Sequence, residues 1–264
     1  MIIDSFMFFN EFDILEGRLE YLYDVVDRFV IVESNRSHTC KPKPLYFKQN
    51  QARYKKYMDK IVNVVYKNMN TSTPNAWIHE NAQRNYMLEG LNDCPDDAWV
   101  MIGDVDEIPD KKKLVSILKI ITTDKQYGTT ERFSFQQRMF YYNFNQFNSI
   151  WWRGTQLAKN RLVKEMMPQF VRDRRTDKDL LVINDSGWHL TYWGQPETIR
   201  YKIENFAHQE YNDEQYKSLD HIQESIKKGK DLFDRSEWGT LVKCDRRSLD
   251  DDMLKVFGKY VVNV

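Results

Sequence analysis

Cysteine is scarce in this chain of 264 residues, and an excess of either charge is absent. Cys40, Cys94 and Cys244 are far apart and form no CxxC pair. This spacing argues against a disulfide framework and a structural zinc site, and it favours a reducing compartment. Basic and acidic residues number 39 each. Because no general basic field is present to hold phosphates, we expect no nucleic-acid partner.

Long apolar runs are also absent. No stretch approaches the roughly 18 apolar residues that cross a bilayer. A signal peptide begins with basic residues before its apolar stretch, but here Asp4 interrupts the first apolar residues and no basic residue precedes them. We therefore expect no transmembrane segment and a cytoplasmic location. The oligomeric state is left open.

Apolar strand-like runs alternate with segments of helical period in the first half of the chain. The expected strands are residues 2–9, 28–34, 60–67 and 98–103, and the expected helices are residues 11–26, 49–58 and 77–91. This alternation predicts an α/β fold with parallel strands joined by crossover helices. Ligands of such sheets bind at the carboxyl ends of the strands, so residues after each strand should converge on one cleft.

The second half is richer in aromatic residues and in β-forming residues, beginning with residues 129–147. Further strands are expected at residues 161–164, 180–183 and 186–194, and helices at 197–206 and 213–228. The last residues, "KYVVNV", are either a tail or an added strand. No repeat or linker divides the chain, so we expect a single domain over residues 1–264.

The segment "VMIGDVDEIPD", residues 100–110, ends a buried strand in several carboxylates. Asp104 and Asp106 would point the same way on an extended chain and could share one divalent cation through oxygen ligands. The alternative is a solvated turn in which Asp110 caps the next helix. His189, in "GWHLTYWG", is either a third metal ligand or a core histidine bonded to backbone.

Phosphatases that form an aspartyl phosphate carry a similar Asp-x-Asp motif. Their motif normally ends the first strand, with Thr or Val two residues after the second Asp. Here the motif follows the fourth expected strand and Ile108 occupies that place, so a metal-dependent phosphohydrolase is the weaker interpretation.

Four segments taken together resemble glycosyltransferase family 17: "FFNEFDILEGRLEYLYDVVDRFVIVES", "KPKPLYF", "DVDEIP" and "GWHLTYWG". The resemblance implies a GT-A fold, a Rossmann-like mixed sheet flanked by helices. It implies a nucleotide-binding half at about residues 1–110 and an acceptor-binding half at about 111–264. It also implies Mn²⁺ or Mg²⁺, a UDP-sugar donor, best matched by N-acetylglucosamine, a glycan acceptor and inversion at the anomeric carbon.

The resemblance assigns site residues by position in its motifs. The metal ligands are Asp104, Asp106 and His189. The implied donor-binding residues are Asn10, Glu11, Glu33, Asn35, Arg84, Asp104 and Glu107. For Arg84 an ion pair with Glu80 or Glu89 is the alternative.

An inverting transfer needs a carboxylate that takes the proton of the acceptor hydroxyl. The first candidate is Glu210, and the second is Asp185. A solvated helix end explains Glu210 equally well. Trp152 with Arg153 is the acceptor-side candidate, and ordinary sheet packing is the alternative.

Two basic segments also have two interpretations. The run "RDRRTDKD", residues 172–179, is either a mobile solvated loop or a lid over the donor. In "KPKP", Lys41 or Lys43 either contacts a phosphate or lies in an exposed turn. A catalytically silent nucleotide- or sugar-binding module on the same fold remains the alternative function.

Overall fold

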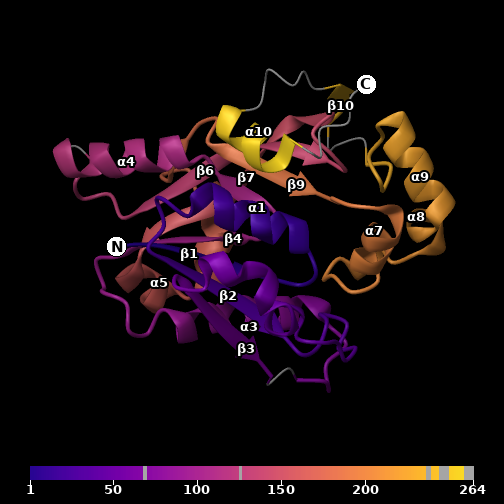
Figure 1. Cartoon of the computed structure of the whole chain (residues 1–264), viewed down its shortest axis with the longest axis horizontal. Helices are drawn as coiled ribbons and strands as arrows, with labels where there is room; N and C mark the ends of the chain where they lie inside the picture. The colour runs from indigo at the N-terminus through magenta and orange to yellow at the C-terminus, as the bar shows by residue number, and fades with distance from the viewer. Residues whose placement is uncertain (68–69, 125–126, 236–238, 244–249, 259–264) are drawn as a thin grey trace.

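The computed structural model describes residues 1–67, 70–124, 127–235, 239–243 and 250–258. Its described strands form one ten-stranded mixed sheet flanked by helices (Figure 1). Four strands in the order β3 (Ile61–Tyr66), β2 (Arg28–Ser34), β1 (Ile2–Met7) and β4 (Trp99–Asp104) run parallel. The prediction of parallel strands in the first half is therefore confirmed, and so is the coarser expectation of a mixed α/β sheet.

The sheet continues beyond β4 through strands of the second half. β7 (Gln146–Lys159) pairs antiparallel with β4, and β6 (Arg132–Tyr141) pairs antiparallel with β7. β9 (Gly187–Thr191) lies parallel to β6, and β5 (Glu107–Pro109) is antiparallel to β9. Short strands β8 (Leu181–Ile183) and β10 (Leu241–Lys243) pair with β6 and β7.

The sheet curls because of where β5 lies. Only Val105 and Asp106 separate β4 from β5, yet three strands stand between these two in the sheet order. The three Cα–Cα steps from Asp104 to Glu107 span about 11 Å at most, so the sheet must bend round to bring its last strand back to β4. The acidic turn of residues 104–107 closes this bend.

Helices cover both faces of the parallel strands. Val30 and Val32 belong to one buried cluster, whereas Phe29 and Ile31 belong to the other, as the two-residue period of a strand requires. The Phe29 face is covered by α1 (Phe12–Leu22), α4 (Lys111–Thr123) and α10 (Asp251–Phe257). The opposite face is covered by α3 (Ala76–Asn85), α5 (Asn160–Met166) and α6 (Pro168–Asp173).

Gly17 of α1 is a point of close approach. A Cβ placed there would lie 2.0 Å from the ring of Phe257 on α10. The missing side chain thus opens a notch in α1 that this buried ring fills. Phe257 also packs edge-on against Phe144, with 6.0 Å between ring centroids.

A third buried cluster lies at one end of the sheet. It joins β6 and the end of β9 to α7 (Pro196–Ile203) and α9 (Leu219–Lys228), which stand with α8 (Glu214–Lys217) on the right of Figure 1. Tyr141, Tyr192 and Ile203 are among its buried members. This cluster fixes α7 beside the end of β9, where the site described below is found.

Some predicted elements differ from the structure. Residues 161–164 were expected as a strand but lie in α5, because Leu162, Val163 and Met166 share one helix face that packs on the second cluster. The expected helix over 77–91 changes to a 3-10 helix, η2 (Tyr86–Gly90), after α3. The expected helix over 49–58 is α2 (Tyr46–Gln49) followed by the 3-10 helix η1 (Gln51–Tyr57).

Two predictions concern residues that the structure does not describe. The segment "KYVVNV" and Cys244 fall outside the described residues. Cys40 and Cys94 are free thiols. Among the helices that the structure describes, none combines the length and the apolar character needed to cross a bilayer.

Candidate functional site

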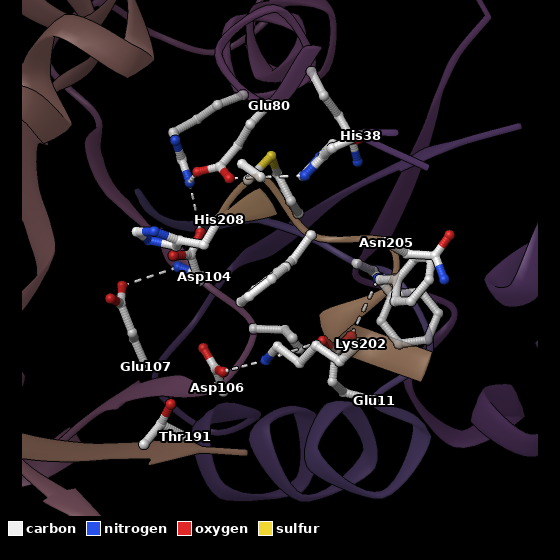
Figure 2. A pocket seen from close by; sticks show the side chains of 18 of the residues that line it. Glu11, His38, Glu80, Asp104, Asp106, Glu107, Thr191, Lys202, Asn205 and His208 are labelled. Atoms are coloured by element: carbon white, nitrogen blue, oxygen red, sulfur yellow. Dashed lines mark hydrogen bonds and ion pairs between the residues drawn. The ribbon is translucent and has the colours of Figure 1, made fainter. Parts of the chain in front are cut away.

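A pocket of about 380 Å³ opens where the carboxyl ends of β1 and β4 meet α3, α6, α7 and β9. Asp104, Asp106 and Glu107 line it, together with Glu11, Arg84 and His189. The pocket lies at the strand ends where a parallel sheet places ligands. Figure 2 shows Glu80 and His38 on one side of it, and Asp106, Lys202 and Glu11 together on the other.

The three carboxylates of the acidic turn point in different directions (Figure 2). Asp104 is the last residue of β4, Asp106 lies in the turn, and Glu107 begins β5. The expectation that Asp104 and Asp106 point the same way is wrong, because the chain turns between them instead of staying extended. Asp110 caps α4 by accepting from the amides of Lys112 and Lys113, as the structural alternative expected.

Asp104 is held by two arginines. Arg84 donates to Oδ1 and Arg172 to Oδ2, each at 2.9 Å. Burial raises the pKa of the Asp104 carboxyl, but the charges of Arg172 and Arg84 outweigh this and hold the pKa well below its usual range. Arg84 also pairs with Glu80 at 2.9 Å, so the ion-pair interpretation of Arg84 is confirmed, and its contact with a donor stays a prediction.

Glu107 is fully buried and is the centre of a second network. Arg172 donates to both of its carboxylate oxygens at 2.5 Å, and the Trp152 Nε1 donates to one of them at 2.5 Å. Arg172 also donates to the Gly154 carbonyl at 2.6 Å. Glu107 therefore orders the site's framework, and its orientation leaves Asp104 and Asp106 facing the pocket.

The basic run at residues 172–179 is not a mobile solvated loop at its start. Arg172 lies on α6 and is only 4% exposed. Its guanidinium donates to the carboxylates of Glu107 and Asp104, which are 65 and 68 residues away in the chain. That this run forms a lid over the donor stays a prediction. The following Arg174–Thr176 segment forms the 3-10 helix η3.

Asp106 forms the other polar centre of the pocket. The Lys202 ammonium on α7 donates to Asp106 Oδ2 at 2.9 Å and lies 3.5 Å from Glu11 Oε1. Burial lowers the pKa of Lys202, but the Asp106 and Glu11 carboxylates outweigh it and raise the pKa above its usual range. His189 Nε2 lies 3.8 Å from Asp106 Oδ1.

His189 reaches this position through strand pairing. It lies opposite Glu107 in the β5–β9 ladder, and its ring stacks on Trp152 with 5.2 Å between ring centroids. Its Nδ1 is buried and has no hydrogen-bond partner within the described part of the chain. The imidazole is thus held by its neighbours with Nε2 toward Asp106.

The donor set at Asp106 can be compared with what a divalent cation needs. Among the residues that the structure describes, no three His, Cys, Asp or Glu side chains gather to hold a metal ion. Mg²⁺ sites commonly use one or two protein ligands together with substrate phosphates and water. Asp106 and His189 fit such a shared site, whereas Asp104 is committed to Arg84 and Arg172.

Three cationic side chains of the pocket lack a carboxylate partner. Within the described residues, Arg36, Lys43 and Arg175 line the pocket without forming an ion pair. Burial lowers the pKa of Lys43 to about 8. Burial and the nearby charge of Arg172 also lower the pKa of Arg175, which lies over the Trp152 ring at 5.0 Å. Cations in this condition gain most from a bound anion.

Three implied donor-binding residues lie outside the pocket lining: Glu33, Asn35 and Asn10, the last of which lines a neighbouring cleft. Glu33 is fully buried, and its carboxylate accepts from the amides of Phe47 and Lys48 at 3.0 Å each. Asn35 contributes its carbonyl to the Lys43 amide at 3.0 Å. These contacts hold the loop that carries Lys43, and donor contact by Glu33 or Asn35 stays a prediction.

The two candidate bases also lie outside the pocket lining. Glu210 is half exposed and bonds to His208 Nδ1 at 2.6 Å. Asp185 pairs with Arg138 at 2.6 Å on an exposed turn. Neither carboxylate faces the pocket, so the geometry argues against both as the base. Arg153 is likewise absent from the lining, while Trp152 is part of it.

Several pocket residues were missed from the sequence. Arg172, Arg175 and Lys202 are three of the seven Lys and Arg side chains that line the described pocket. The position of Lys202 was a signal, because this residue lies in the helix that directly follows the "GWHLTYWG" motif. Nothing local distinguishes Arg172 from the exposed Arg174 beside it.

Comparison with known proteins decides the family. The profile described as Glycosyltransferase family 17 matches residues 1–237. The chain belongs to glycosyltransferase family 17. The match includes every residue named above in the family 17 pocket.

Three named relatives have low sequence identity to this family 17 chain. Beta-1,4-mannosyl-glycoprotein 4-beta-N-acetylglucosaminyltransferase of Homo sapiens is 26% identical over 238 residues. The proteins of the same name from Rattus norvegicus and Mus musculus are 26% and 25% identical. Each alignment covers 76% of this chain, which spans 42% of the relatives' own length.

A solved structure also shows a weak likeness. The inositol-1-phosphate CTP transferase from T. maritima has a TM-score of 0.36 at 12% identity, covering 72% of this chain and 85% of that one. At this score the likeness decides neither the fold nor the activity of the family 17 chain.

Proposed function

We propose that this chain is a metal-dependent, inverting glycosyltransferase with a GT-A fold. It moves a sugar, best matched by N-acetylglucosamine, from a UDP-sugar to a hydroxyl of a glycan acceptor. The proposal rests above all on one observation. Arg36, Lys43 and Arg175 face the pocket without ion-pair partners among the described residues, as a site for a diphosphate requires.

The leaving diphosphate needs compensation of its growing negative charge. Lys43, which is charged below its pKa of about 8, and Arg175 supply positive charge from the lining of the pocket. Asp106 and His189 would hold Mn²⁺ or Mg²⁺, which when bound supplies further positive charge to the diphosphate. Lys202, which pairs with Asp106, lines the same pocket and would add its ammonium to this compensation.

The base belongs in the pocket instead of at Glu210 or Asp185. Of the carboxylates that line the described pocket, Asp173 is the one without an ion pair. It ends α6, it is exposed, and it accepts a hydrogen bond from Gln169 at 2.7 Å. An ionised carboxylate not bound to a cation keeps its lone pairs for a proton, so we assign Asp173 the task of receiving the acceptor's proton.

The test combines binding and turnover. Nucleotide sugars are screened for hydrolysis and transfer with Mn²⁺, Mg²⁺ or EDTA, and UDP binding is measured by calorimetry. Asp106→Asn should lower turnover by at least about 10²-fold, whereas Asp185→Asn, the same change outside the pocket, should leave it unchanged. Asp173→Asn should lower kcat by about 10²–10⁴-fold with UDP affinity kept.

Two results would contradict these assignments. UDP binding without hydrolysis or transfer of any donor in the panel would favour the silent binding module. Equal turnover of Asp173→Asn and wild type would remove Asp173 from the mechanism and leave the enzyme class in place.

A further inference from the structure

A second cleft of about 690 Å³ is lined by residues of α7, the first turn of α1 and the helix α9. α7 separates the two cavities, because Lys202 lines the first pocket and Thr198 lines the second. Glu11 lines both. The second cleft is therefore a neighbour of the first, joined to it at the end of β1.

The side chains of this cleft combine donors and acceptors without a charge excess. Four carboxamides line it, each able to donate and to accept: Asn10, Asn143, Gln195 and Gln223. Its charged residues balance, two acidic and two basic: Glu11, Asp13, Arg53 and Lys227. Arg53 and Asp13 already form an ion pair. This lining suits an uncharged ligand rich in hydroxyl groups, whereas the first pocket also presents cations that form no ion pair with a described residue.

An aromatic surface completes the cleft. Trp193 is half-buried and packs edge-on against Phe144, with 4.8 Å between ring centroids, so its indole is held in one orientation. Tyr142 and Tyr192 adopt positive φ angles of 65° and 50°. These turns are joined by a bond from the Tyr142 amide to the Thr191 carbonyl at 3.1 Å, and the residues that follow them, Asn143 and Trp193, both line the cleft.

We propose that this cleft binds a neutral oligosaccharide, the portion of the acceptor glycan away from the reacting hydroxyl. The inference rests on the proposed function, because a transferase acting on a glycan must hold more of it than one hydroxyl. An indole face accepts the C–H face of a sugar ring, and carboxamides pair with its hydroxyls. The cleft volume lies within the range of about 300–1,000 Å³ of small-molecule sites.

The test uses three uncharged trisaccharides as probes: chitotriose, mannotriose and maltotriose. Their binding is measured by saturation-transfer NMR and calorimetry, with and without UDP. Gln223→Trp fills the cleft from the exposed face of α9, and Gln215→Trp makes the same change on α8, away from both cavities. Gln195→Trp is a second filling variant, and circular dichroism checks that each variant is folded.

At least one trisaccharide should bind wild type and Gln215→Trp equally, and the filling variants at least about tenfold more weakly. UDP affinity should stay within about twofold in all variants. Trisaccharide binding that is unchanged in both filling variants, or no binding of any probe at millimolar concentration, would overturn the inference.

The outcomes separate this inference from the proposed function. Donor hydrolysis without trisaccharide binding would refute the cleft as a saccharide site while supporting the transferase. Trisaccharide binding that Gln223→Trp weakens, without hydrolysis of any nucleotide sugar, would support the cleft and refute the transferase.

Discussion

Arg172 is the side chain whose loss should cost the fold most among the pocket residues. It is 4% exposed and donates to Glu107, Asp104 and the Gly154 carbonyl. Replacing it by Met keeps much of the apolar length but leaves the fully buried Glu107 without a countercharge. Breaking a buried ion pair in this way typically costs about 3–5 kcal/mol. We expect Arg172→Met to lower the free energy of unfolding by that amount.

The matched control is Arg174→Met, two residues along the same chain segment. Arg174 is 48% exposed and pairs with Asp177, so its removal should cost about 1 kcal/mol or less. Both variants are compared with wild type by reversible urea titration, at equal denaturant slope. The double variant Arg172→Met with Glu107→Gln removes the orphaned charge and should recover part of the loss. A cost for Arg172→Met no larger than that of Arg174→Met would refute the reasoning.

Three further predictions concern the neighbourhood of the pocket. The ammonium of Lys43, with its pKa of about 8, is charged below that pH, so UDP affinity should fall as pH rises from 7 to 9.5, and calorimetry should show a weaker fall in Lys43→Met. Gly154→Ala places a Cβ 2.7 Å from the Glu107 carboxyl carbon, and the crowding should cost about 1–3 kcal/mol in urea titration; an unchanged midpoint would contradict this close packing. Glu33→Gln leaves the amide of either Phe47 or Lys48 without a carboxylate acceptor, which should cost about 1–3 kcal/mol, while UDP affinity measured by calorimetry should be unchanged if Glu33 is structural.

The fold of the first half could be predicted because its signals are local. Apolar runs of strand length alternate with segments of helical period, and parallel strands follow from that order. The place of β5 could not be predicted in this way. Its partner β9 is about 80 residues further along the chain, and three residues beginning at Glu107 carry too little pattern to indicate a strand.

The candidate site was predictable where residues follow strand ends and was not where partners are distant. Asp104, Asp106 and His189 were singled out from their motifs, and the structure places all three in one pocket. The rule that alternate residues share a face failed because the chain turns at Asp106. Arg172 was interpreted as solvated because a charged run normally is, and only the fold shows the buried Glu107 that it serves.

The notch at Gly17 bears on where the chain can be truncated. The family match ends at residue 237, and all residues that line the two cavities fall within it. The ring that fills the notch belongs to α10, beyond that limit. Burying Met253 and Phe257 contributes about 1.5–3 kcal/mol each. The segment that matches the family is thus shorter than the segment that packs into one core, and a chain cut after residue 237 would leave the notch at Gly17 unfilled by Phe257.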